Sequence, residues 1–301
     1  MNDVEAIAYL EQSDQYRVIQ RLNAPERYWH GEPSTARIGI VIDTEATGLD
    51  TDNDKIIELG FVAFEYDAGS GLIYRILHTY DAFEDPGEPL EDIVKQITGI
   101  TDEMLAGQHL DEDGANVWLE KADLIIAHNA AFDRQMLERR LPVVSKSNWA
   151  CTFSDILWMD EDISSLKLDY IAYKLGFFFD GHRAVNDAQA TLHVLTKPLP
   201  CSGKLAMATL LASAREKSRR FFAFRAPFEK KDDLKTRGYR WLPEFTYQGK
   251  KGVWSISVPD AAIEDEQQWL SDSVYKGKTA QFIFKDITAA DRYSIREFTA
   301  P

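Results

Sequence analysis

Two carboxylates follow directly on an apolar run, and their spacing could bind a metal ion. The run Ile40–Ile42 leads into Asp43, and Glu45 follows two positions later. Side chains two apart in a strand point to the same face, so these carboxylates are expected to project together. Like charges that close repel, and one takes up a proton unless a cation lies between them. Divalent cations that prefer oxygen ligands meet that need. A plain strand-to-turn junction, where Asp, Thr and Gly are common, also explains the segment taken alone.

Two further acids stand at the starts of predicted helices. Asp133 ends the segment HNAAFD, which follows a short apolar run and opens a helix. Asp187 lies five residues after His182 in the segment GHRAVNDAQA. His182 is on the lead-in to that helix, where it could swing over a site while Asp187 stays fixed. The alternatives are an acid that stabilises a helix N-terminus and a surface histidine.

The elements that must position these residues follow from hydrophobic periodicity. Strands are expected at 37–43, 56–66, 71–80 and 123–127, and helices at 130–140, 166–175 and 182–195. A meander of strands followed by helices alternating with short strands predicts a mixed α/β sheet flanked by helices. Apolar residues at helical spacing predict a docking helix over 3–22, and prolines and a glycine make 23–36 a linker.

The C-terminal third has a different composition, which predicts a smaller α+β domain over 201–301. Residues 1–200 hold 16 Lys/Arg against 36 Asp/Glu, whereas residues 201–301 hold 18 against 13. Between Arg215 and Lys251, eight aromatic residues are interleaved with 12 basic ones. Basic side chains can hold phosphates and aromatic rings can stack on bases, so this domain could bind single-stranded nucleic acid. The alternative is a packed domain with aromatics in its core and lysines in solvent.

Composition and length limit the remaining classes. A chain of 301 residues has room for two domains. It contains no apolar run long enough for a membrane span and begins with no signal segment. Its two cysteines, Cys151 and Cys201, have no metal-ligand spacing and argue against a disulfide scaffold. We therefore expect a cytoplasmic protein with reduced thiols.

Taken together, the acidic segments resemble the motifs of the DEDDh exonucleases. That family includes the proofreading epsilon subunit of bacterial DNA polymerase III, ribonuclease T and oligoribonuclease. Its first motif is similar to DTEATG here, with Ala46 in place of a threonine; the second is similar to HNAAFD, and the third matches His182, Ala184 and Asp187. Residues 201–301 and the segment YRVIQRL also resemble stand-alone bacterial exonucleases related to the epsilon subunit. The resemblance implies a ribonuclease-H-like fold over 37–200, after an N-terminal helix and linker over 1–36.

The resemblance also implies an activity and a set of functional residues. Asp43, Glu45, Asp133 and Asp187 would hold two Mg²⁺ or Mn²⁺ ions, and His182 would act as general base. The enzyme would hydrolyse single-stranded nucleic acid, with DNA favoured over RNA, from the 3′ end and release nucleoside 5′-monophosphates. Two alternatives are an exoribonuclease that trims RNA or short oligoribonucleotides, and an accessory or proofreading subunit that docks on a polymerase or repair complex.

Four further residues near the motifs are weaker candidates for substrate contacts. They are Thr44, Leu49, His128 and Asn129. Leu49 could wedge against the terminal base or pack in the core, and Asn129 could bond a phosphate or cap a helix. His128 could support a metal ligand or pack at a strand end.

Overall fold

The structure is a computed structural model that describes residues 2–276 and 282–301. The chain divides into two compact units, residues 1–211 and 212–301, with helix α9 (Ala206–Arg215) running across the division. Each unit is described here by itself. The domain limits expected from the sequence, at 36/37 and 200/201, stay predictions.

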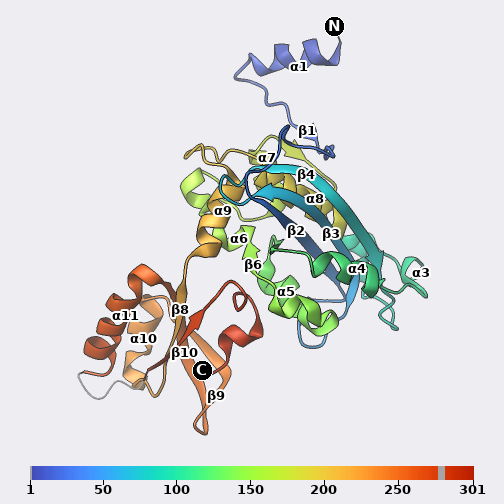
Figure 1. The fold of residues 1–301 in the computed structure, drawn as a ribbon. Helices are drawn as coiled ribbons and strands as arrows, with labels where there is room; N and C mark the ends of the chain where they lie inside the picture. Colours follow the sequence, from blue (N-terminus) through green and yellow to red (C-terminus); the bar gives the residue numbers. More distant parts are fainter. Residues whose placement is uncertain (1, 277–281) are drawn as a thin grey trace. The chain divides into compact units, whose positions relative to one another are not determined.

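The first unit is built on a five-stranded mixed sheet in the order β4-β3-β2-β5-β6 (Figure 1). The strands are β2 (Ala36–Ala46), β3 (Ile56–Asp67), β4 (Ile73–Phe83), β5 (Leu124–Ala127) and β6 (Trp149–Cys151). Central β2 pairs antiparallel with β3 and parallel with β5. The middles of β2 and β3 are fully buried, which explains their nearly continuous apolar sequences. This order confirms the predicted ribonuclease-H-like sheet.

Helices cover both faces of this sheet. They are α2 (Asp92–Thr98), α3 (Asp102–Leu105), α4 (Glu112–Leu119), α5 (Ala130–Arg140), α6 (Thr152–Asp155), α7 (Leu168–Lys174) and α8 (Ala184–Leu195). Short 3₁₀ turns span Pro142–Lys146 and Trp158–Glu161. Helix α8 packs directly on β3 at Gly60, where a Cβ atom would lie 2.2 Å from the Val185 nitrogen. Only glycine permits this close approach, so the sequence ELG in β3 sets the position of α8.

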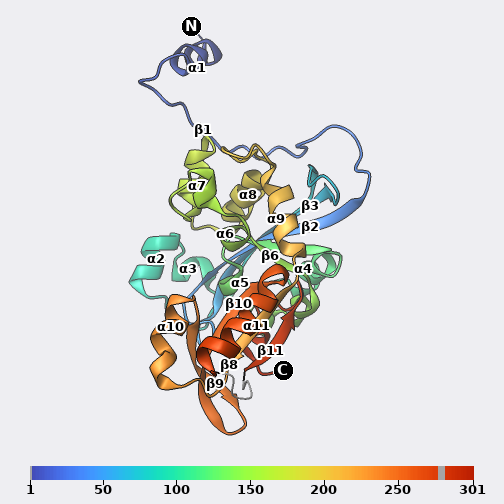
Figure 2. The same cartoon turned by 90° about the vertical axis from the view of Figure 1, so that its left-hand side faces the viewer.

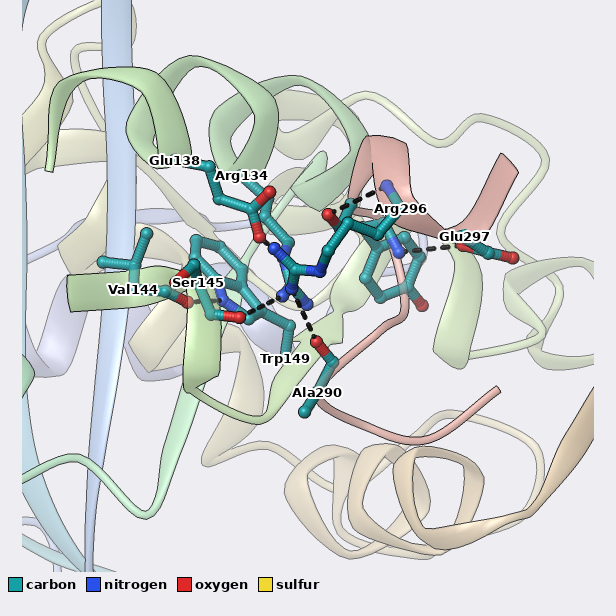
Figure 3. A network of polar contacts seen from close by, with 10 residues as sticks. Arg134, Glu138, Val144, Ser145, Trp149, Ala290, Arg296 and Glu297 are labelled. Carbon is teal, nitrogen blue, oxygen red and sulfur yellow. Dashed lines mark hydrogen bonds and ion pairs between the residues drawn. The ribbon is translucent and has the colours of Figure 1, made fainter. Parts of the chain in front are cut away.

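A buried arginine fixes helix α5. The guanidinium of Arg134, fully buried, donates to Glu138 at 2.7 Å and to the Ser145 carbonyl at 3.2 Å (Figure 3). It also lies over the ring of Trp149, 5.4 Å from its centroid. A buried charge is tolerated when it is paired and hydrogen-bonded in this way. The network ties α5 to the turn and strand that follow it.

The N-terminal helix is shorter than the sequence indicated. Helix α1 covers Asp3–Glu11 and begins with a capping box between Asn2 and Glu5, but it does not continue to residue 22. Gln20–Arg21 form strand β1, which pairs in parallel with β7 (Phe177–Phe178). Arg17 donates to the carbonyls at the end of α7. These tertiary contacts favour an extended backbone after α1, and helical periodicity in the sequence does not reveal them. None of the described helices has the length and apolarity needed to cross a membrane.

The second unit has a four-stranded antiparallel sheet in the order β11-β8-β10-β9 (Figure 2). Its elements are β8 (Ser218–Ala223), α10 (Lys231–Thr236), β9 (Arg240–Tyr247), β10 (Lys250–Pro259), α11 (Ile263–Trp269) and β11 (Ile283–Ile287). Short turns cover Phe228–Lys230, Asp260–Ala262, Leu270–Val274 and Ile295–Phe298. This βαββαβ order is the split βαβ, or ferredoxin-like, arrangement. It confirms the predicted α+β class. The sequence also predicts a strand over 279–285, and that range falls partly on residues outside the described ranges.

Five of the eight aromatic residues between Arg215 and Lys251 belong to the core of this unit, as the packed-domain alternative required. They are Phe221, Phe222, Phe224, Tyr239 and Phe245. Phe221 and Tyr239 belong to the core between the sheet and its helices, and Phe222 and Phe245 to a cluster on the opposite face. The prediction that bases stack on these five rings is therefore wrong for the structure as described. Phe228 and Trp241 remain exposed, at 80% and 48%.

Candidate active site

Three of the predicted acids converge where β2 ends. Asp43 and Glu45 lie on β2, and Asp187 lies in the first turn of α8. One carboxylate oxygen from each lies within 4.8 Å of the other two. Asp43 is in register with Gly60 of β3, so the glycine that admits α8 lies beside the carboxylates that Asp187 meets. The predicted convergence of Asp43 and Glu45 with Asp187, more than 140 residues away in the sequence, is present.

Burial and mutual repulsion raise the pKa values of these carboxylates. Burial, followed by the charges of Asp133 and Asp187, raises the pKa of Asp43 well above its usual range. Burial raises the pKa of Glu45 to about 8. Burial also raises the pKa of Asp187 to about 6, against the opposing effects of the Arg183 N–H and the His182 charge. Such a cluster is electrostatically incomplete without a cation.

Helix α5 brings Asp133 to strand β2. It is 3% exposed and sits one turn into α5, which begins at Ala130 as predicted. Its Oδ1 accepts from the Thr44 N–H at 3.0 Å and from the Thr44 hydroxyl at 2.8 Å. Burial raises the pKa of Asp133 to about 7, and these two hydrogen bonds oppose that rise. Thr44, expected to contact substrate, therefore positions an acid in this structure.

A buried ion pair that sequence reasoning missed anchors the start of α8. Glu58 of β3 is fully buried and accepts from Arg183 Nε at 2.9 Å and Nη2 at 2.8 Å. Its other oxygen accepts from the Ala184 N–H at 3.0 Å. The Arg183 N–H in turn donates to Asp187 at 3.2 Å. An acid inside the apolar run IIELG was the available signal, since such an acid is rarely buried without a partner.

His182 has a strained backbone next to this anchor. It is exposed and adopts φ of +63°, a left-handed conformation that is uncommon for residues other than glycine. It precedes the Arg183 cap of α8, so its ring is carried on the lead-in, as expected. Its charge lowers the pKa of Asp187, and both residues line the same cleft.

A cleft of about 650 Å³ opens at His182 and Asp187. Its lining is mostly apolar, with Phe153, Leu166 and Phe179 contributing, and Asn129 lies on its wall. The Asn129 side chain makes no capping bond to α5, so the helix-cap alternative is not supported. Phe153, which sequence reasoning missed, is 41% exposed there.

His128 is a structural bridge at the edge of the cleft. Its Nε2 pairs with the Leu166 carbonyl at 2.8 Å and its Nδ1 with the Thr152 hydroxyl at 2.8 Å. Because a carbonyl only accepts, Nε2 carries the proton and Nδ1 accepts from Thr152. Burial lowers the pKa of His128, which keeps the ring neutral. The strand-end alternative thus describes this residue.

Leu49 lies in the loop after β2 and is 88% exposed. The core-packing alternative is therefore wrong for it. The loop itself is ordered by Asp54, which accepts from the Thr47 hydroxyl at 2.8 Å and from the Asp50 N–H at 2.7 Å. This hydrogen-bonded loop presents an exposed apolar side chain that is available for contact with a ligand.

The acids present fit a divalent cation. Asp43, Glu45 and Asp187 supply only oxygen ligands, and the guanidinium of Arg183 is bound to Glu58 rather than to them. Clustered, partly desolvated carboxylates are the donor set that Mg²⁺ and Mn²⁺ prefer. Asp133 lies outside the 4.8 Å group but acts electrostatically on Asp43.

The chain is similar to segments of bacterial replicative polymerases. It is 31% identical over 170 residues to the PolC-type DNA polymerase III of Caldanaerobacter subterraneus subsp. tengcongensis, covering 53% of this chain and 11% of that protein. It is 31% identical over 177 residues to the PolC-type enzyme of Thermotoga maritima, covering 57% of this chain and 12% of that protein. The chain thus spans about a tenth of the length of these relatives.

Solved structures that are similar to part of this chain include two exonucleases. Exonuclease X in complex with 5′ overhanging duplex DNA is 24% identical with a TM-score of 0.43, covering 58% of this chain and 99% of that one. The nuclease domain of 3′hExo, a DEDDh family member bound to rAMP, is 18% identical with a TM-score of 0.43, covering 58% and 97%. The RNase_T exonuclease family model matches residues 40–195, which include every predicted acid and His182. Because this match takes in more than half of the chain, the protein belongs to that exonuclease family, and the resemblance drawn from its motifs is confirmed.

Proposed function

We propose that the protein is a metal-dependent 3′→5′ exonuclease that removes nucleoside 5′-monophosphates from single-stranded 3′ ends, with DNA favoured over RNA. The observation that carries the proposal is the convergence of Asp43, Glu45 and Asp187 within 4.8 Å at the mouth of a cleft. The preference for DNA is supported by the similarity to DNA polymerases.

The acids have a shared role in this proposal. Asp43, Glu45, Asp133 and Asp187 hold two divalent ions, and Mg²⁺ and Mn²⁺ both suit oxygen ligands. When bound, such ions make water more acidic and offset negative charge on attacking and leaving oxygens. Thr44 keeps Asp133 in place through two hydrogen bonds, at 3.0 and 2.8 Å. The pair formed by Glu58 and Arg183 keeps Asp187 in place through the start of α8.

His182 handles the proton of the reaction. Imidazole exchanges protons near neutral pH, and the exposed lead-in lets this ring reach a water in the cleft. The ring accepts a proton as the water oxygen bonds to phosphorus and the bond from phosphorus to the 3′ oxygen breaks, and the leaving 3′ oxygen takes up a proton from solvent. The products are a nucleoside 5′-monophosphate and a strand one nucleotide shorter.

The test follows single-stranded DNA and RNA of one sequence, each labelled at the 5′ end, with Mg²⁺, with Mn²⁺ and with chelator. A 3′→5′ enzyme shortens the labelled strand stepwise and does not release the label first. Asp43→Asn should abolish hydrolysis, and His182→Asn, which tolerates the left-handed backbone, should slow it about 10²- to 10⁴-fold. Hydrolysis by Asp43→Asn at the wild-type rate would falsify the site assignment. Faster degradation of the RNA would favour the RNA-trimming alternative.

The relatives favour a second possibility, a role beside a polymerase. The matched segment is about a tenth of each PolC-type protein, so this exonuclease resembles a part of a larger replication enzyme. A protein that docks on a polymerase should co-elute with it in gel filtration. Separate elution at concentrations well above physiological ones would exclude stable docking.

A further inference from the structure

One face of the sheet in residues 212–301 carries a pattern of basic and aromatic side chains. Helices α10 and α11 pack on the opposite face, where Phe221, Leu234 and Leu270 form the core. Strand registers place one row across the first face, made of Ile283, Phe222, Ser255 and Arg240. The adjacent row is made of Lys285, Arg220 and Ser257. Side chains two apart on a strand share a face, so both rows belong to the same surface, which we call the basic face.

The basic face has the chemistry that single-stranded nucleic acid requires. Arg220, Arg240 and Lys285 lie on three different strands and can contact successive phosphates. Phe222 lies on the inner strand β8 and stacks on Phe245, with ring centroids 4.7 Å apart. Sheets of this strand order in other proteins stack bases on aromatic residues of their two inner strands. That likeness concerns topology alone, and the support for binding comes from the positions of Arg220, Arg240 and Lys285.

The C-terminal segment Ser294–Ala300 covers the basic face. Glu297 forms an ion pair with Arg220, and both side chains are largely buried (Figure 3 shows Glu297). The Phe298 ring lies over the same guanidinium, 4.4 Å from the Arg220 Cζ atom. Lys285 donates to the Arg296 carbonyl at 2.8 Å. Ala300 packs on the cluster formed by Phe222 and Phe245.

These contacts have the form of contacts to a nucleotide. A carboxylate occupies the place of a phosphate beside Arg220, and a phenyl ring occupies the place of a base stacked on its guanidinium. We propose that the basic face binds single-stranded nucleic acid and that the segment Ser294–Ala300 is an internal competitor for it. Binding displaces the segment, and the segment in turn limits binding to ligands that supply both a phosphate and a base.

The fit of the segment is incomplete, which is the property a displaceable competitor needs. Within the part of the chain that the structure describes, Arg220 Nε is buried without a hydrogen-bond partner, and Nη1 reaches Ser255 only at 3.3 Å. A cleft of about 370 Å³ remains between β9 and the segment, lined by Leu242, Phe245 and Phe298 among others. Ile295 is 56% exposed.

Displacement is energetically feasible because the charge pairing is exchanged rather than lost. Removing one partner of a buried ion pair is costly since it leaves the other charge uncompensated. A phosphate that replaces the Glu297 carboxylate keeps Arg220 paired and adds contacts to Arg240, which is exposed. Glu297 itself then returns to water.

The test measures binding in chelator, where no hydrolysis occurs, by fluorescence anisotropy of the full chain with a short labelled oligothymidylate. The inference rests on the proposed function only for the class of ligand. We expect Glu297→Gln to tighten binding several-fold, because the competitor loses its charge. Arg240→Gln should weaken binding and lower the slope of log K against log salt by about 0.7, the value for one phosphate of a single strand. Lys235→Gln, an exposed cation on helix α10, is the matched control and should leave both unchanged.

A second measurement separates a competitor from a structural cap. Hydrogen exchange of Ser294–Ala300 in the wild-type chain should become faster when the oligonucleotide is added, whereas a cap would show unchanged or slower exchange and overturn the competitor. Equal binding by the Arg240→Gln and Lys235→Gln variants would overturn the basic face as the site. A chain that binds through Arg240 but hydrolyses nothing with metal upholds this inference and refutes the proposed function. If the chain hydrolyses nucleic acid but Arg240→Gln leaves binding unchanged, the proposed function holds and this inference is refuted.

Discussion

The ion pair between Glu58 and Arg183 should control metal affinity although neither residue belongs to the acidic group of three. Glu58 holds the start of α8 with three hydrogen bonds, two from Arg183 and one from the Ala184 N–H. The Arg183 backbone N–H then bonds to Asp187 at 3.2 Å. We expect the loss of this anchor to move Asp187 relative to β2. The two variants that test it are Glu58→Gln and Arg183→Met, each of which removes one partner of the ion pair.

The two changes should differ in their cost to stability. Glu58→Gln keeps an acceptor for Ala184 and leaves an arginine whose side chain is 34% exposed and can be hydrated, so we expect a loss of about 1–2 kcal/mol. Arg183→Met leaves Glu58, fully buried, without its cation, and such a loss costs about 3–5 kcal/mol. Because the penalty of Arg183→Met arises from the Glu58 charge, the double variant should lose much less than the sum of the two.

Metal affinity distinguishes an effect on the site from a loss of stability alone. Removing a partner that orients a metal ligand typically costs 10- to 100-fold in affinity or activity. Calorimetric titration of Glu58→Gln with Mn²⁺ should show a loss of about that size, and single-turnover hydrolysis should fall in parallel. Chemical denaturation of the same samples reports the free energy of unfolding.

A second ion pair of the same unit is the matched control. Glu84 binds Arg140 through contacts of 2.7 and 2.8 Å, and its side chain is 18% exposed. Glu84→Gln should lower stability by about 1 kcal/mol and leave Mn²⁺ affinity unchanged. If Glu58→Gln behaved like this control, with wild-type Mn²⁺ affinity and turnover, the anchor would be structural only and the reasoning would fail.

Three further predictions concern the same unit. Gly60→Ala places a Cβ 2.2 Å from the Val185 nitrogen, so it should lower the free energy of unfolding by about 3 kcal/mol or more and remove most of the activity. Denaturation and a nuclease assay measure these two losses. In the control Gly69→Ala, the new Cβ lies 3.3 Å from a side-chain oxygen and should cost less than about 1 kcal/mol. Burial, with Lys197, lowers the pKa of His193 to about 4, so its stabilising contribution is complete above about pH 6.5 and disappears as pH falls through 4. Because the ring is partly exposed and solvent screens its charge, the wild-type chain should lose about 1–2 kcal/mol over this window. Urea titration should show a smaller loss for His193→Gln. Asp43→Asn removes one of several repelling charges and should raise the melting temperature in chelator at neutral pH; a decrease would contradict the repulsion.

The local features of the site could be read from the sequence. Helix α5 has the expected bounds, Ala130–Arg140, because an apolar strand, an asparagine and a polar helix follow one another within a few residues. Asp43 and Glu45 follow the apolar run, as expected, although β2 continues to Ala46. The prediction that these segments meet depended on the order and spacing of three motifs. Periodicity indicates which face of an element is apolar, but it does not indicate which elements become neighbours.

The features that could not be read depend on partners distant in sequence. Glu58 and Arg183 are 125 residues apart, and neither position signals the other. Strand β9 contains Pro243 and several polar residues, a composition that argues against a strand unless it lies at a sheet edge, as β9 does. The faces taken by Arg220 and Phe222 depend on which strands pair and in what register. Alternation is visible in sequence, but the identity of the buried face is a tertiary property.

The separation of charges between the two units follows from what the acids must bind. Residues 1–211 hold 17 Lys/Arg against 36 Asp/Glu, and residues 212–301 hold 17 against 13. A lysine or arginine placed among Asp43, Glu45 and Asp187 would pair with them and take the position of the cation. The structure instead binds Arg183 to Glu58, which leaves the cluster incomplete and its pKa values raised. An acidic unit also repels a polyanion, so attraction for nucleic acid has to come from bound cations or from basic residues placed elsewhere. Arg220, Arg240 and Lys285 on a separate sheet provide such residues without competing for the metal site.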